Sequence, residues 1–84
     1  MSDQQSASSW SEIRAKEVSR RAQDLVNTSV QDLQSGLWAY NTRADLRVLR
    51  AALKIVNRRK ETTKAKALNR RIKQVEVGLG VKLS

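Results

Sequence analysis

The residues best suited to chemistry in this chain are five basic side chains that recur every three or four positions, Arg43, Arg47, Arg50, Lys54 and Arg58. On a helix this spacing puts them within about 80° of one line, about 22 Å long. Like charges three or four residues apart repel, and no acidic residue interrupts this face before Glu61. The row is typical of a surface that binds a phosphate backbone, and a merely solvated basic face is the alternative.

The rest of the composition argues against catalysis. The chain has 84 residues with 17 Lys plus Arg, 8 Asp plus Glu, and no His, Cys, Pro or Phe, which gives a formal charge of +9. It therefore lacks the commonest general base, a thiol nucleophile and the ligands of a zinc finger. No phosphate loop, nucleophile elbow or EF-hand pattern occurs. We expect no enzyme, no cofactor, no metal site and no small-molecule substrate.

The charge is concentrated in the second half of the chain. Residues 1–35 carry four basic and five acidic side chains, whereas residues 36–84 carry thirteen basic and three acidic ones. Binding of an anion is therefore expected mainly in the second half. Such a charge imbalance bears on association with anions and not on the fold.

The spacing of apolar residues predicts a first long helix over residues 10–35. Ser9 and Glu12 fit a capping box, and residues 1–9 are expected to be a disordered polar leader. An apolar stripe runs down one face, interrupted by Ser29, with Gly36 as the stop. Its members are Ala15, Val18, Ala22, Leu25, Val26, Val30 and Leu33. A helix of this length needs a partner of similar length.

Two further helices are predicted over residues 42–60 and 63–77. Thr42 and Asp45 form a weaker capping pair for the second, and Thr62 or Thr63 caps the third. The apolar phase changes over residues 57–63, which leaves open whether one helix bends or two separate. The second stripe is Leu46, Val48, Leu49, Ala52, Leu53, Ile55 and Val56, and the third is Ala65, Leu68, Ile72, Val75 and Leu79. Residues 78–84 are expected to be a flexible tail.

Trp38 and Tyr40 lie in the first link, over residues 37–41. We expect them to pack against the end of a helical hairpin, and stacking on a nucleobase is the alternative. The predicted fold is all-α and a single domain over residues 10–77. It is a long antiparallel hairpin with a short third helix across one end. So short a chain, without disulfides or metal, has a marginal core, so we expect a homodimer that forms a four-helix bundle.

The remaining question is which anion the basic row binds. A membrane surface would call for bulky aromatics along the apolar face, and no apolar run is long enough to span a bilayer. The first nine residues have no signal-peptide pattern, so a soluble cytoplasmic protein is expected. A helix-turn-helix would need shorter helices, and sequence-specific readers of single-stranded RNA use aromatics on a sheet or a glycine-rich clamp, neither of which is present. Double-stranded RNA, read by shape, fits a straight row best.

The start of the second helix resembles the nodavirus RNA-silencing suppressors. The matching residues are Asp45 and Leu46, followed by Leu49, Ala51 and Leu53. The resemblance implies a dimeric four-helix bundle that lies along double-stranded RNA in the host cytoplasm. It also implies a viral protein that blocks Dicer cleavage and sequesters small interfering RNA.

The sequence therefore predicts a homodimeric binder of double-stranded RNA without sequence preference. The basic row should contact phosphates, and Asn57 a 2′-hydroxyl. Arg20 and Arg21 could extend the face from the first helix. Two other classes stay open: a small phage or plasmid DNA-binding regulator, with DNA as the second choice of partner, and a helical scaffold or protein-interaction module.

Overall fold

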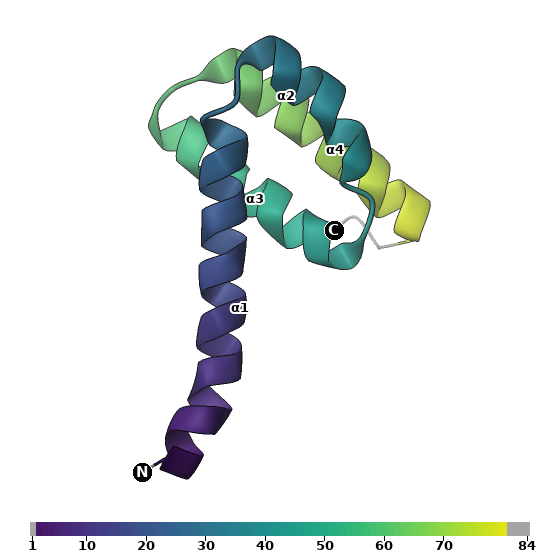
Figure 1. Cartoon of the computed structure of the whole chain (residues 1–84). Helices are drawn as coiled ribbons and strands as arrows, with labels where there is room; N and C mark the ends of the chain where they lie inside the picture. Colours follow the sequence, from purple (N-terminus) through teal and green to yellow (C-terminus); the bar gives the residue numbers. More distant parts are fainter. Residues whose placement is uncertain (1, 81–84) are drawn as a thin grey trace.

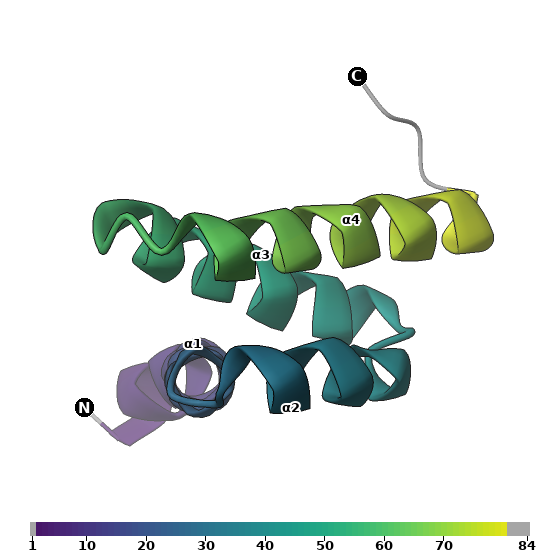
Figure 2. The ribbon, with the colours of Figure 1, turned by 90° about the horizontal axis from the view of Figure 1, so that it is seen from above.

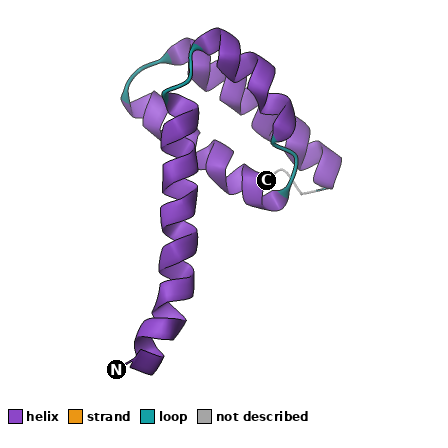
Figure 3. Cartoon of the chain, viewed as in Figure 1, coloured by secondary structure: helices purple, strands orange, loops and turns teal. Residues whose placement is uncertain are grey.

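Four α-helices and one turn of 3₁₀ helix make up the computed structural model, which describes residues 2–80 and their side chains from residue 10 onward. The elements are α1 (Ser2–Val26), α2 (Val30–Gly36), η1 (Leu37–Ala39), α3 (Arg43–Arg58) and α4 (Thr62–Leu79). No strand occurs in residues 2–80 (Figure 3). The predicted all-α class is confirmed.

The helices are arranged around α3. Seen from above, α3 lies at a level between α4 on one side and α1 and α2 on the other (Figure 2). The α2 helix packs on α4, and α1 packs on α3. Figure 1 shows that α1 crosses α3 and that its first half projects away from the other helices. The predicted long antiparallel hairpin of the first two helices is therefore wrong.

The helix predicted over residues 10–35 is divided at residues 27–29. The Thr28 hydroxyl donates to the Asp24 carbonyl at 2.9 Å. The Ser29 hydroxyl accepts the Asp32 backbone N–H at 3.2 Å and so caps α2. Short hydroxyl side chains satisfy backbone groups locally and thereby compete with helix continuation. From α4, Lys64 Nζ donates to the Val26 carbonyl at 2.7 Å, which satisfies an orphan carbonyl at the end of α1.

The ends of the fold also differ from the prediction. Because α1 begins at Ser2, Ser9 lies inside a helix, so the capping box at Ser9 and the disordered leader are wrong. At the other end, α4 includes Gly78 and ends at Leu79. Gly80 caps it with a φ of 71°, the left-handed conformation that glycine adopts at low cost. Residues 81–84 of the predicted tail lie outside the described residues.

The second and third predicted helices agree better with the structure than the first one does. Thr42 and Asp45 form the complete capping box of α3. Residues 59–61 separate α3 from α4, so there are two helices and not one bent one. The cap predicted at Thr62 or Thr63 is wrong, because Glu61 precedes α4 and its side chain makes no capping bond.

One apolar core holds the helices together. Its buried members come from all of the predicted stripes, and α3 contributes the most because it is covered from two sides. They are Ala22, Leu25, Val26, Leu33, Leu37, Leu46, Val48, Leu49, Ala52, Val56, Leu68, Ile72 and Val75. The core therefore fixes which side of α3 faces solvent.

Candidate nucleic-acid interface

The basic row predicted on the second helix lies on the solvent side of α3. Arg43, Arg47, Arg50, Lys54 and Arg58, which we call the α3 row, are all exposed, as is Asn57 beside them. The opposite side of the helix carries the buried Leu49, Ala52 and Val56. Because the core holds that side, the basic side chains are presented along one rigid line.

Most of the α3 row has no counter-charge. Arg50 forms an ion pair with Glu76 of α4. Among residues 10–80, no carboxylate lies within 4.0 Å of Arg43, Arg47, Lys54 or Arg58. Arg43 is also the first residue of α3, where the helix dipole disfavours a cation. Local stability therefore does not explain the row.

Arg20 does not extend the row as a free cation. Its guanidinium contacts Glu17 at 2.6 Å and Asp24 at 3.4 Å, both on α1. The hydrogen bond from Arg20 holds the pKa of the Glu17 carboxyl below its ordinary value. The charge of Arg20 is thus balanced within its own helix.

Arg21 makes structural contacts between helices and does not extend the row. Its Nη2 donates to Asp45 Oδ1 at 3.1 Å, and its guanidinium lies 5.6 Å from the centre of the Tyr40 ring. It is half-buried and joins α1 to the start of α3. Tyr40 itself is half-buried against the core, although the hairpin at whose end it was predicted to pack does not form.

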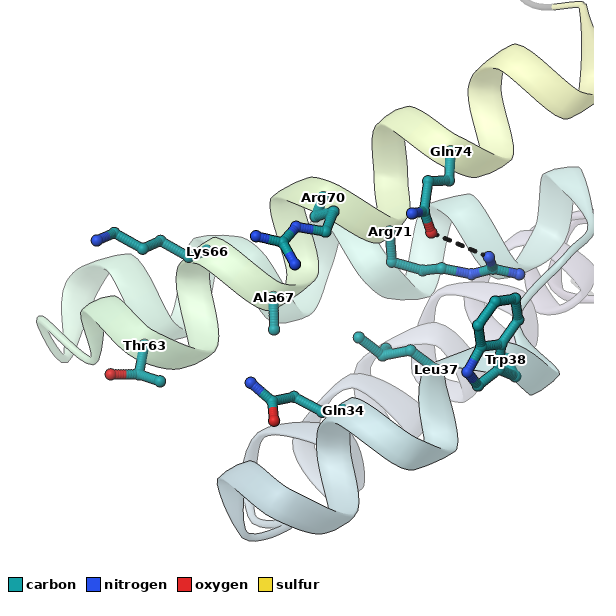
Figure 4. Close-up of a pocket in the computed structure, with 9 residues that line it drawn as sticks. All are labelled: Gln34, Leu37, Trp38, Thr63, Lys66, Ala67, Arg70, Arg71 and Gln74. Atoms are coloured by element: carbon teal, nitrogen blue, oxygen red, sulfur yellow. Dashed lines mark hydrogen bonds between the residues drawn. The ribbon is translucent and has the colours of Figure 1, made fainter.

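A second basic cluster, which sequence reasoning did not single out, lies between α2 and α4. Lys66, Arg70 and Arg71 line a groove of about 630 Å³ together with Trp38, and we call it the α2–α4 groove. Figure 4 shows these side chains with the other lining residues, Gln34, Leu37, Thr63, Ala67 and Gln74. The i, i+4 spacing of Lys66, Arg70 and Gln74 was the available signal, but nothing in the sequence showed that Trp38 would face it.

Trp38 and Arg71 are both placed differently from what their residue types suggest. Trp38 is 72% exposed, so the prediction that it packs at a hairpin end is wrong. Arg71 is only 8% exposed. Its guanidinium lies 5.2 Å from the centre of a Trp38 ring, a distance within reach of cation–π attraction.

A third concave surface lies between α1 and α3. It has a volume of about 570 Å³, and its lining includes Trp10, Ile13, Arg43 and Arg47. Trp10 is 72% exposed and Ile13 is 58% exposed. The projecting half of α1 thus presents large apolar side chains that nothing in residues 10–80 covers.

The described part of the chain contains neither a membrane-spanning helix nor a cluster of metal ligands. Within residues 2–80 no helix is both long and apolar enough to cross a membrane. The same residues hold no group of three His, Cys, Asp or Glu side chains that could bind a metal ion. No family model, curated protein or solved structure matches the chain. The functional assignment therefore depends on the surfaces of α1, α3 and α4 themselves.

Proposed function

We propose that this protein binds double-stranded RNA without sequence preference, through the α3 row, and that it acts as a binding protein and not as an enzyme. The observation that carries the proposal is the exposed line of five cations, four of which have no carboxylate partner among residues 10–80. A line of about 22 Å in which four of five cations are unneutralised suits a run of phosphates better than one small anion.

The choice of duplex RNA depends on shape. A straight, rigid helix face can follow a phosphate backbone, and A-form RNA is recognised mainly through phosphates and 2′-hydroxyls. Arginine suits phosphate because its planar fork can donate two parallel hydrogen bonds. Asn57, exposed beside the row, carries an amide able to contact a 2′-hydroxyl. Duplex DNA, whose backbone carries the same charges, is the second candidate.

The proposal includes a homodimer formed through α1. The first half of α1 projects without a partner (Figure 1), and an isolated helical segment of this kind is marginal in water. Ser2–Val26 carries four acidic and four basic residues. Two copies of α1 can therefore meet without the repulsion that α3 or α4 would cause.

We expect light scattering at micromolar concentration to give the mass of a dimer. Replacing Trp10 and Ile13 with serine should shift it to a monomer because both side chains are exposed, and any loss of helicity should be confined to the projecting half of α1. A matched control replaces Trp38 and Val77, which are comparably exposed at 72% and 67%. A monomeric wild-type protein, or equal effects of the two double variants, would contradict the dimer.

The family resemblance adds a biological consequence to this proposal. A protein that covers the phosphates of duplex RNA would keep Dicer from cleaving it and would sequester small interfering RNA in the host cytoplasm. A virus would gain from such a protein as a suppressor of RNA silencing.

A mobility-shift comparison of duplex RNA, single-stranded RNA and duplex DNA of equal length tests the partner. We expect the tightest binding to duplex RNA, equal for unrelated sequences, and weaker binding as salt rises. Equal or tighter binding to duplex DNA would overturn the RNA assignment, and preference for a palindrome would indicate a DNA-binding regulator. Retained dimerisation without any nucleic-acid binding would indicate a scaffold.

A further inference from the structure

The α2–α4 groove concentrates positive charge without any acidic residue in its lining. Lys66, Arg70 and Arg71 provide the cations, whereas Gln34, Gln74 and Thr63 provide amide and hydroxyl groups. Among residues 10–80, no carboxylate lies within 4.0 Å of these three cations. No α3 residue lines the groove, so it is separate from the α3 row.

Arg71 is a buried cation with neutral partners only. Its guanidinium donates to the Tyr40 carbonyl at 3.1 and 3.2 Å, to Gln74 Oε1 at 3.2 Å and to the Asn41 side chain. These four bonds use four of its five N–H donors but leave its charge unbalanced. A buried charge without a counter-ion favours an anion nearby. The groove is therefore attractive to negative charge at its inner wall.

Trp38 adds a flat aromatic surface at the same place. The Arg71 guanidinium lies over the Trp38 ring, 5.2 Å from its centre, and Figure 4 shows the two side chains next to each other. The Trp38 carbonyl accepts a bond from Asn41 Nδ2 at 2.8 Å, which holds the segment in position. The indole is nevertheless 72% exposed, so its other face is free. A fixed, exposed aromatic beside cations is the arrangement with which proteins stack and hold unpaired nucleotides.

We propose that the α2–α4 groove is a second nucleic-acid site, which takes unpaired nucleotides of a single strand. The base stacks on the free face of Trp38, and the flanking phosphates lie at Lys66 and Arg70. The volume of about 630 Å³ is within the range of ligand sites. An anionic lipid, or an acidic peptide without aromatic residues, would satisfy the cations but would bring no ring for Trp38.

The test uses Trp38 fluorescence in the full-length Trp10→Phe protein. The chain has two tryptophans, and in this variant only Trp38 remains. Titration with single-stranded oligoadenylate should give saturable quenching. Adenosine monophosphate should quench with lower affinity, because it brings one phosphate, and polyglutamate should not quench. Absence of quenching by the oligonucleotide, or equal quenching by polyglutamate, would overturn the site. Tighter binding of the monophosphate would show that a free nucleotide, and not a strand, is the ligand.

Two charge-matched variants test the role of the cations. Replacing Lys66 and Arg70 with glutamine should weaken oligoadenylate binding about tenfold or more. Replacing Arg59 and Lys60, exposed in the link before α4, removes the same charge and should change binding less than about threefold. Equal effects of the two pairs would mean non-specific attraction and would overturn the proposal.

Trp38→Ala tests stacking, with anisotropy of a labelled strand as readout. We expect about a five- to 100-fold loss, the range for one stacked base. Loss of less than twofold would overturn the stacking role.

The α3 row and the groove are distinguished by replacing Arg43 and Arg47 with glutamine. This variant should bind duplex RNA more weakly, whereas the strand should still quench Trp38 fluorescence. Quenching that disappears in that variant would assign the strand to α3.

Discussion

Replacing Arg43, Arg47 and Lys54 together with glutamine is expected to weaken duplex RNA binding about 100-fold at physiological salt. Each phosphate contact releases a counter-ion, which at about 0.15 M salt is worth roughly 1 kcal/mol, or about a factor of five. Losing three contacts therefore lowers the affinity about 100-fold. The slope of log affinity against log salt should become shallower by about three.

The same substitutions should leave the free energy of unfolding unchanged or slightly increased. Arg43 opposes the helix dipole at the first turn of α3. Arg43 and Arg47 are four residues apart and repel each other. All three side chains are exposed and lack carboxylate partners among residues 10–80. A surface that loses its ligand while the fold gains stability indicates residues retained for binding.

The measurement is a salt series of binding isotherms together with thermal unfolding followed by circular dichroism. A control of equal charge replaces Arg14, Lys16 and Lys73, which are exposed on α1 and α4. It should weaken binding no more than several-fold. Similar losses for the two triple variants would show that net charge, and not the α3 row, accounts for binding.

The α3 helix was the element that sequence alone described best, because its information is local. Its capping box, its apolar stripe and its basic row all follow from residues within a few turns of one another. The helical period alone therefore places the row opposite Leu49 and Val56. Which cations in that row are free is not local, since Arg50 is paired with Glu76 twenty-six residues away.

The break in the first predicted helix could not be predicted from local periodicity. The apolar stripe continues across Ser29, so periodicity favoured one helix over residues 10–35. The structure breaks it there, because Thr28 and Ser29 bond to the backbone and Lys64 of α4 bonds to the end of α1. That last contact joins residues 38 positions apart, and no window of sequence contains it.

The candidate site residues likewise depend on contacts between helices that are far apart in the sequence. Arg20 and Arg21 are neighbours of the same charge, yet one is exposed in a pair on its own helix and the other is half-buried against Asp45. From the sequence Arg71 resembles one more surface cation, but it is buried and lies next to Trp38. Helix packing decided both outcomes, and the α2–α4 groove exists only because of it.

Asp45→Ala is expected to lower the free energy of unfolding by about 2–3 kcal/mol. Its carboxylate accepts the backbone N–H groups of Asn41 and Thr42 at 2.9 and 3.0 Å. It also accepts Arg21 Nη2 at 3.1 Å and so ties α1 to α3. Losing a cap costs about 1 kcal/mol, and the stranded partners add roughly as much again. Arg21 is partly solvated, which keeps the total below that of a fully buried pair.

The loss should appear as a decrease in melting temperature of about 10–20 °C, since 1 kcal/mol shifts a domain of this size by about 4–8 °C. Asp24→Ala is the matched control, because Asp24 also faces an arginine but is exposed on α1. It should change stability by less than about 0.5 kcal/mol. Equal decreases for the two variants would show that the Asp45 contacts do not join the helices.

The contribution of Asp45 should also depend on pH. Burial alone would raise its pKa, but the hydrogen bonds from Thr42, Asn41 and Arg21 together outweigh burial and hold the pKa below its ordinary value. A carboxyl whose pKa is lower in the folded state stabilises the protein at pH values above its unfolded pKa of about 3.9. That stability is lost as the pH falls through the lower folded value. Wild-type protein should therefore lose its advantage over Asp45→Asn as the pH falls below about 4, measured as the difference in urea midpoint. A constant difference from pH 7 to pH 2 would show that the charge of Asp45 is not what holds α1 to α3.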